Sequence, residues 1–427
     1  MTGKNWIERD AAVVWHGFTQ MERYADNTPL IIERAEAHEL IDVDGRRYLD
    51  AISSLWVTTL GHRVPELDEA LREQLDRVAH STLLGNGNRV VVEFAEALAR
   101  VVPLHDPHVL FASDGASAVE QALKIAFQYW TNLGVAGRTT YLAFGDAYHG
   151  DTVGSLSLGG GGFGTQIFDP LRFPVLRAPS FAQPGALKAA ANLVREHRDR
   201  LAAVVVEPLV QGAAGMLSAP ADSFVHLADA CRETGVLLIC DEVATGFGRT
   251  GTLFASEQCR MRPDLMCLGK GITGGYLPMS ATVVNDRVYR AFLGEDLSEK
   301  TFYHGHSYGG NALAAAVALR HLQLLQSRAI LDNVRARSAQ LHQALQPLRQ
   351  RSTVRDIRLV GLMGAVELDT SNNPLLARRV CAAMVRRGVL SRSMGPVVTL
   401  VPLLTVTAAH IDRIVATLGE ALDEVSA

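Results

Sequence analysis

Short apolar runs alternate with helical patterns through the middle of the chain. The runs lie at residues 109–112, 140–144, 201–206, 236–240 and 265–268. Between them, apolar residues recur at helical spacing, as in the segments 119–130 and 222–234. Strands without polar alternation are typical of a parallel sheet that is covered by helices on both faces. The pattern therefore predicts an α/β domain with a mainly parallel sheet.

The two ends of the chain have a different pattern. Residues 30–50 predict two strands around a turn, and a long helix is expected at 311–326. A small α+β unit is expected after this helix, with strands at 357–368 and 388–401 and helices at 375–387 and 408–425. The expected organisation is an N-terminal segment 1–64, a large domain 65–325 and a C-terminal small domain 326–427. We expect the N-terminal segment to pack with the small domain.

The composition narrows the function classes without selecting one. The chain of 427 residues is 48% hydrophobic and 20% charged, with a formal net charge of -4. This balance gives no electrostatic reason to expect nucleic acid or an anionic membrane as a partner. No uncharged apolar run approaches about 20 residues, so we expect neither a membrane span nor a signal peptide. The five cysteines form no CxxC pair, so we expect no disulfide framework, no metal site and a cytoplasmic location.

Small, aromatic and charged residues follow the predicted strands, at the edge where open parallel sheets bind ligands. These segments are Ser113-Asp114-Gly115-Ala116-Ser117, Gly145-Asp146-Ala147-Tyr148-His149-Gly150, Glu207-Pro208, Asp241-Glu242 and Gly269-Lys270-Gly271. Each segment alone is ordinary, but together they predict a ligand site at one edge of the sheet.

Lys270 and Asp241 each have two interpretations. A lysine in a glycine-rich turn is usually solvated. After an apolar strand, however, Lys270 is also suited to form a Schiff base, because burial lowers the pKa of lysine and frees the amine. Asp241 is either a turn or N-cap carboxylate or a buried carboxylate that keeps a cationic ring nitrogen protonated.

Two further features, at the start of a helix and at Tyr148, also have two interpretations, whereas a glycine-rich third feature has one. Gly115 and Ala116 begin a helix directly after a strand, which indicates either tight packing or an anion site at a helix N-terminus. Tyr148 either packs on the core or stacks on a planar cofactor ring. The glycine run at 159–164 matches GxGxxG, but no helix follows it, so it predicts a flexible loop and not a dinucleotide site.

Longer segments make the chain similar to a known family. The most specific are Asp241-Glu242-Val243-Ala244-Thr245-Gly246-Phe247-Gly248-Arg249-Thr250-Gly251 and Gly269-Lys270-Gly271-Ile272-Thr273-Gly274-Gly275. Further matching segments lie at 15–21, 53–56, 122–130, 148–152, 210–213 and 304–308. On these segments the chain resembles the class III (fold-type I) aminotransferases, which depend on pyridoxal 5'-phosphate (PLP). The resemblance implies the fold-type I architecture, a large PLP domain and a small α+β domain built from both chain ends.

The resemblance also implies roles for individual residues. Lys270 would hold PLP covalently, Asp241 would pair with its pyridine nitrogen, and Tyr148 would stack on its ring. The phosphate would be bound by Asp114, Gly115 and Ala116, and by His306 and Ser307 from the other subunit of a homodimer. The substrate would contact Trp56, Tyr148, Gly305 and Arg392, the last of which suits a carboxylate because its fork binds in a bidentate way.

The chain departs from the family pattern mainly in the pocket for the amine donor. Phe18 stands where a tyrosine is frequent, and Leu55 replaces the first of two paired tryptophans. Asp114 stands where the phosphate turn usually has Ser or Asn. An acidic side chain is unfavourable beside a phosphate unless it points away or caps the helix. Ser113 or Ser117 would then supply the hydroxyl group that contacts the phosphate.

The branch that the chain resembles most implies a reaction of biotin synthesis. In it, 8-amino-7-oxononanoate becomes 7,8-diaminononanoate, with S-adenosylmethionine or lysine as the amino donor. The alternative enzyme is another class III ω-aminotransferase that uses 4-aminobutyrate, a diamine or a similar amine. A non-catalytic or nucleotide-binding protein is an alternative of a different class. The presence of Lys270 and Asp241 argues against a non-catalytic protein. The failure of the glycine run at 159–164 to fit a dinucleotide fingerprint argues against a nucleotide-binding protein.

Overall fold

The computed structural model describes residues 3–27, 29–162 and 164–426. The chain separates into two compact units, one made of Met1–Pro65 with Arg335–Ala427 and the other of Glu66–Val334. The limits expected from the sequence, after residues 64 and 325, stay a prediction. In the structure the second division falls within the helix α12 (Ile330–Leu345).

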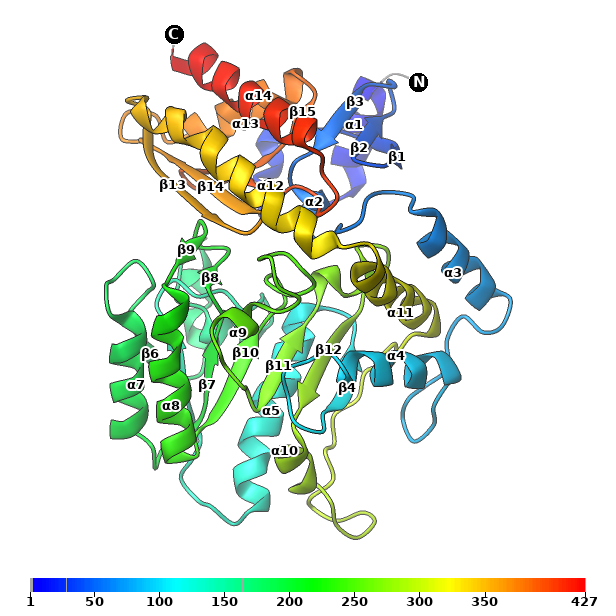
Figure 1. Ribbon diagram of the computed structural model, residues 1–427, viewed down its shortest axis with the longest axis vertical. Helices are drawn as coiled ribbons and strands as arrows, with labels where there is room; N and C mark the ends of the chain where they lie inside the picture. The colour runs from blue at the N-terminus through cyan, green and yellow to red at the C-terminus, as the bar shows by residue number, and fades with distance from the viewer. Residues whose placement is uncertain (1–2, 28, 163, 427) are drawn as a thin grey trace. The chain divides into compact units, whose positions relative to one another are not determined.

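The Glu66–Val334 unit is built around a seven-stranded sheet with the order β4-β12-β11-β10-β7-β5-β6 (Figure 1). Its strands are β4 (His108–Ala112), β5 (Thr140–Phe144), β6 (Leu176–Ala178), β7 (Leu201–Val206), β10 (Leu237–Asp241), β11 (Leu265–Leu268) and β12 (Ser280–Val284). Only β12 runs antiparallel to its neighbours; the other pairs of this sheet are parallel. The prediction of an α/β fold with a mainly parallel sheet is therefore confirmed.

In the described part of the chain, nine helices accompany this sheet. They are α3 (Pro65–Leu75), α4 (Arg89–Ala99), α5 (Gly115–Asn132), α6 (Val153–Leu158), α7 (Ala186–Glu196), α8 (Phe224–Thr234), α9 (Ala255–Gln258), α10 (Asp286–Arg290) and α11 (Ala312–Ser327). Along the chain, α5 to α9 lie between the strands of the sheet, α3 and α4 precede β4, and α10 and α11 follow β12. The longest helix of this set, α5, contacts β4, β7, β10, β11 and β12. It presents the fully buried Ala118, Ala122 and Ala126 at a four-residue spacing, and these small side chains let the helix approach the sheet closely.

Shorter pieces complete this unit. They are β8 (Val210–Gln211), β9 (Leu217–Ser218) and the 3-10 turns η3 (Thr165–Leu171), η4 (Ala221–Ser223) and η5 (Lys270–Thr273). The glycine run at 159–164 was expected to have no helix after it, but the 3-10 turn η3 begins at Thr165; the element before the run is the helix α6 and not a strand.

The other unit contains two four-stranded sheets. The first, β1-β2-β3-β15, is made of β1 (Ile32–Glu36), β2 (Glu39–Asp42), β3 (Arg47–Asp50) and β15 (Val389–Leu390). The prediction of two strands at 30–50 is wrong, since three form there. The extra turn is at Ala37, which adopts a positive φ of 50° and pairs with His62, and no glycine or asparagine marks it in the sequence.

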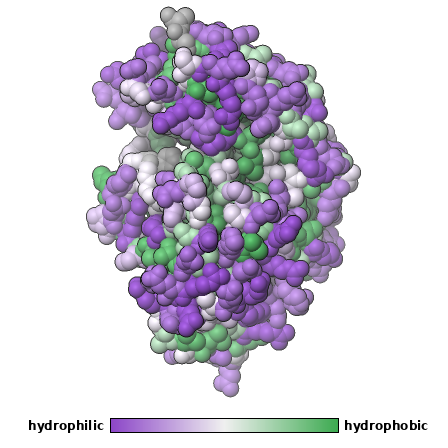
Figure 2. Space-filling view, turned by 60° about the vertical axis from the view of Figure 1, so that its left-hand side comes forward, coloured by the Kyte–Doolittle hydropathy of each residue, from purple (hydrophilic) through white to green (hydrophobic). Residues whose placement is uncertain are grey.

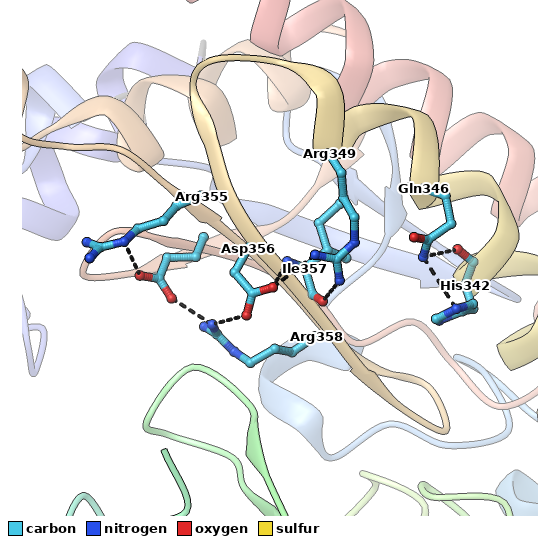
Figure 3. A network of polar contacts seen from close by, with 8 residues as sticks. His342, Gln346, Arg349, Arg355, Asp356, Ile357 and Arg358 are labelled. Atoms are coloured by element: carbon cyan, nitrogen blue, oxygen red, sulfur yellow. Dashed lines mark hydrogen bonds and ion pairs between the residues drawn. The ribbon is translucent and has the colours of Figure 1, made fainter. Parts of the chain in front are cut away.

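The second sheet has the order β13-β14-β17-β16. Its strands are β13 (Val354–Val360), β14 (Met363–Leu368), β16 (Arg392–Met394) and β17 (Val397–Leu400). The helices and turns of the unit are α1 (Gly3–Val13), η1 (Met21–Arg23), η2 (Ala25–Asn27), α2 (Ser53–Trp56), η6 (Gln346–Gln350), α13 (Leu376–Arg386) and α14 (Ala408–Ser426). The Asp356 carboxylate accepts hydrogen bonds from Arg349 at 3.0 Å and Arg358 at 2.9 Å, which ties η6 to β13 (Figure 3).

Hydrophilic residues cover much of the face seen in Figure 2, with smaller hydrophobic patches between them. Among the described residues, no helix is long and apolar enough to cross a membrane.

Candidate active site

The carboxyl ends of β7, β10 and β11 lie side by side at one edge of the large sheet. The parallel register pairs Cys240 with Val206 and Asp241 with Cys267. The residues that follow these strands, Glu207 and Lys270, therefore flank Asp241 along the edge. The structure thus brings the strand-end residues Glu207, Asp241 and Lys270 to the same edge of the sheet.

Asp241 is a buried carboxylate with fixed orientation. Its exposed fraction is 5%, and it ends β10. The Oδ2 atom lies 2.7 Å from Nδ1 of the buried His149, and Oδ1 accepts the N–H of Val243 at 3.0 Å. The other ring nitrogen of His149, Nε2, is buried and has no hydrogen-bond partner within the described part of the chain. The Val243 contact agrees with the turn interpretation, and the contact with His149 gives the buried carboxylate a polar partner.

Lys270 begins η5, one residue after the end of β11, and adopts a positive φ of 41°. A positive φ is costly for a residue with a side chain, so the surrounding structure must impose it. Burial lowers the pKa of the Lys270 ammonium group, while the carboxylates of Asp241 and Glu207 act in the opposite direction. A lysine with a lowered pKa is a better nucleophile and proton acceptor than a solvated one.

The helix N-terminus after β4 is tightly packed and is capped by a carboxylate. A Cβ atom on Gly115 would lie 2.5 Å from Cγ1 of Val243, so only glycine fits between the helix and the Asp241 segment. Asp114 is the N-cap of α5: its Oδ1 accepts the N–H of Ser117 at 2.9 Å, and its Oδ2 accepts the Ser117 hydroxyl at 2.8 Å. The carboxylate is thus used as a helix cap, and the first backbone N–H groups of α5 remain suited to an anion.

Tyr148 lies in the loop after β5. Its N–H donates to Oε1 of Glu207 at 3.1 Å, and its hydroxyl donates to Asp151 at 2.9 Å. Burial and the Asp151 carboxylate raise the pKa of this phenol, so it stays neutral at ordinary pH. A backbone contact therefore links the Tyr148 loop to the residue that follows β7.

Two acidic residues of this edge were not assigned a role from the sequence. Glu207 is 6% exposed, and burial raises the pKa of its carboxyl to about 7. Glu242 is fully buried, but it caps α9 by accepting the N–H groups of Ala255 and Ser256 at 2.8 and 2.7 Å. His149 was missed as well, because the sequence does not say which strand ends are neighbours.

The segment 305–307 is held by other parts of the same unit. The carbonyl of Ser307 lies 2.7 Å from His80 Nε2, and the N–H of Tyr308 donates to Nδ1 of His306 at 3.2 Å. A Cβ atom on Gly305 would contact Leu84 at 3.1 Å. Ser307 is exposed, so the segment presents polar groups on the surface of the unit.

Trp56 and Arg392 belong to the other compact unit. Trp56 is buried at 8% exposure and has a positive φ of 64°. Arg392 is exposed at the start of β16 and, with Phe18, lines a cavity of about 620 Å³ within that unit. Leu55 is half exposed. Arg392 and Phe18, which the sequence assigned to one substrate pocket, thus share a cavity.

The fold and the strand-end site define a fold-type I transferase. The family model described as "Aminotransferase class-III" matches residues 20–422. The adenosylmethionine-8-amino-7-oxononanoate aminotransferase of Nitratidesulfovibrio vulgaris is 46% identical, over 97% of this chain and 80% of the relative. The structure of the enzyme of that name from Methanocaldococcus jannaschii is 38% identical and covers 99% of both chains, with a TM-score of 0.94.

A third similar protein carries a different name. The amine transaminase from an uncultivated Pseudomonas species, solved in a PLP-bound form, is 32% identical over 96% of this chain and 98% of its own, with a TM-score of 0.91. The chain therefore belongs to the class III aminotransferase family. It is an aminotransferase, of a family that generally depends on PLP and acts on small-molecule amines and keto compounds.

Proposed function

We propose that this aminotransferase converts 8-amino-7-oxononanoate to 7,8-diaminononanoate in biotin synthesis, with S-adenosylmethionine or lysine as amino donor. The observation that carries the proposal is the 46% identity, over 97% of this chain, to a relative named for that substrate. Six further relatives of the same name are 36% to 39% identical over at least 96% of this chain.

We propose PLP as the cofactor, because the residues of the strand-end site fit it. The lysine of lowered pKa, Lys270, fits the aldehyde of PLP, and the buried carboxylate of Asp241 fits its ring nitrogen. The aromatic ring of Tyr148 fits the planar ring of the cofactor, and the N-terminus of α5 fits its phosphate. When bound, PLP supplies an electrophilic carbon and a protonated ring that accepts electrons from the substrate carbon.

The chain's own groups would divide the remaining work. Lys270 would hold the cofactor and, once released, move a proton to and from the donor carbon as general base and acid. Asp241, fixed by His149, would keep the ring nitrogen protonated. The N–H groups of Gly115 and Ala116, with the capping Asp114 turned back to its helix, would bind the phosphate.

The substrate pocket would draw on Trp56, Tyr148, Gly305 and Arg392. We propose that the guanidinium of Arg392 binds the substrate carboxylate, since that side chain is exposed and lines a cavity together with Phe18. The apolar Phe18 and Leu55 would suit the long methylene chain of the acceptor.

We propose a homodimer in which His306 and Ser307 of the partner subunit contact the phosphate. Leu84, Tyr303 and Tyr308 are all more than 60% exposed beside this segment, and clustered exposed apolar side chains mark interaction surfaces. A cytoplasmic location is proposed as well, supported by five buried cysteines that are all free thiols.

Complementation of a biotin auxotroph that lacks this one step tests the substrate. We expect growth without biotin on expression of this chain and no growth with its Lys270→Ala variant. Failure of the wild-type chain, together with transfer from 4-aminobutyrate or a diamine by the purified protein, would favour the other ω-aminotransferase. The 32% identity to an amine transaminase is the observation that supports this second candidate.

A further inference from the structure

One carboxylate of helix α5 holds the segment that follows Tyr148. Oε1 of Glu120, in the second turn of α5, accepts the N–H groups of Gly154 and Ser155 at 2.8 and 3.1 Å. The same oxygen accepts the hydroxyl of Thr152 at 2.5 Å. The first backbone N–H groups of a helix have no partner within it. Glu120 therefore caps the short helix α6 from a different element of the fold.

Two glycines let this segment approach α5 closely. A Cβ atom on Gly154 would lie 2.1 Å from Oε2 of Glu120, and a Cβ atom on Gly150 would lie 2.5 Å from Cβ of Ala116. Gly150 also has a φ of 128°, a conformation that favours glycine. The close contact therefore depends on both elements, since α5 supplies the carboxylate and the facing segment supplies two residues without side chains.

The contact with α5 concerns both the aromatic and the phosphate part of the proposed cofactor site. Asp151 accepts the Tyr148 hydroxyl at 2.9 Å and directly precedes Thr152, which donates to Glu120. The segment also passes against Ala116, a member of the proposed phosphate turn. One helix thus carries the phosphate turn and the carboxylate that holds the aromatic segment.

We propose that Glu120 is a positioning residue: it holds the segment 148–155 against α5 and so sets where the Tyr148 ring lies relative to the phosphate of PLP. The inference rests on the proposed function, in which Tyr148 stacks on the PLP ring. Stacking is favourable only over a narrow range of separations and offsets. A segment released from α5 would therefore hold the cofactor ring less well, although the N-terminus of α5 would still face the phosphate.

The same helix offers a matched control. Gln128, about two turns further along α5, donates from Nε2 to the three carbonyls of residues 299–301 at 3.3, 3.3 and 3.1 Å. Like Glu120, it connects α5 to another segment through one side-chain atom and three contacts. The segment that it holds contains none of the proposed site residues. Gln128→Ala therefore removes a connection of the same kind away from the cofactor.

Amide hydrogen exchange of the PLP-free protein, measured by mass spectrometry, tests whether Glu120 holds the segment. We expect the peptide that covers 148–155 to exchange about tenfold faster in Glu120→Ala, because two of its N–H groups lose their acceptor. Glu120→Gln keeps an acceptor oxygen and should exchange nearly as the wild type does. Gln128→Ala should leave this peptide unchanged.

Titration with PLP, followed by absorbance and by visible circular dichroism, tests the effect on the cofactor. The circular dichroism of bound PLP arises from the asymmetric surroundings of its ring, so it reports the position of the ring as well as occupancy. We expect Glu120→Ala to bind PLP about tenfold more weakly and to lose much of this signal at saturation. Gln128→Ala should match the wild type in both measurements, whatever its stability in urea.

Wild-type exchange or wild-type PLP binding and circular dichroism in Glu120→Ala would overturn the inference, and so would an equal loss in Gln128→Ala. If Glu120→Ala folds poorly, Gly154→Ala gives a second test, because its methyl group displaces the carboxylate while Glu120 stays. Normal exchange and a normal PLP signal in that variant would also overturn the inference. Wild-type protein that takes up no PLP would instead contradict the proposed function, and the exchange of the PLP-free variants would still show whether Glu120 holds the segment.

Discussion

The hydrogen bond between His149 and Asp241 allows a direct test of how the edge is organised. The His149 ring is 3% exposed, and its Nδ1 lies 2.7 Å from Oδ2 of a carboxylate that is 5% exposed. His149→Phe keeps the ring shape and removes the donor. His149→Asn is the matched control, because its amide N–H occupies nearly the place of Nδ1.

The magnitude follows from the chemistry of a buried charge. A hydrogen bond to a charged group contributes about 1.5–3 kcal/mol, and a buried carboxylate that loses its partner also loses its fixed direction. Asp241 would then pair less well with the ring nitrogen of PLP. We expect the loss of this hydrogen-bond free energy to appear in PLP binding. Since about 1.4 kcal/mol corresponds to a factor of ten, PLP should bind about 10-fold to 100-fold more weakly.

The assay is a titration of PLP-free protein with PLP, followed by absorbance. We expect a clear weakening for His149→Phe and a small one for His149→Asn. Equal affinity for PLP in wild type and His149→Phe would refute the role of His149 in orienting Asp241. A loss in His149→Asn as large as in His149→Phe would contradict the assignment of the effect to this hydrogen bond.

Three further variants test other parts of the edge. Lys270→Ala should abolish the yellow colour of the PLP-loaded protein and its activity; retained colour with full activity would exclude Lys270 as the cofactor lysine. Asp114→Ala removes the cap of α5 and should cost about 0.5–2 kcal/mol of stability, measured by urea unfolding, whereas Asp114→Asn should cost less. Gly115→Ala places a methyl group 2.5 Å from Val243 and should cost about 1–3 kcal/mol; adding Val243→Ala should recover part of the loss, and no recovery would place the strain elsewhere.

The sequence predicted the central strands well because they are continuous apolar runs. β5, β7 and β11 have the predicted bounds, and β4 and β10 differ by one residue. β12 was missed because Ser280 and Thr282 interrupt its apolar pattern, although both are fully buried. The Thr282 hydroxyl donates to the carbonyl of Ala118 at 2.8 Å, so a hydrogen bond to a distant part of the chain compensates its burial.

The site was predictable as a set of strand ends, but not as a network. Spacing in the sequence places Lys270 and Asp241 after apolar strands, which is sufficient to propose their chemistry. It does not say that β7 lies between β5 and β10, and this order brings Glu207 to the backbone of Tyr148. For Asp114 the sequence left two ways to tolerate a negative charge at this turn, pointing away or capping the helix, and the contacts with Ser117 show that the side chain is the cap.

The most direct test of the proposed activity uses purified protein, PLP and 8-amino-7-oxononanoate, with S-adenosylmethionine and lysine supplied separately as donors. The product is identified by mass spectrometry. We predict that 7,8-diaminononanoate forms with at least one of the two donors and does not form with the Lys270→Ala variant. Absence of this product with both donors, while the same preparation transfers an amino group from another amine, would contradict the proposed substrate.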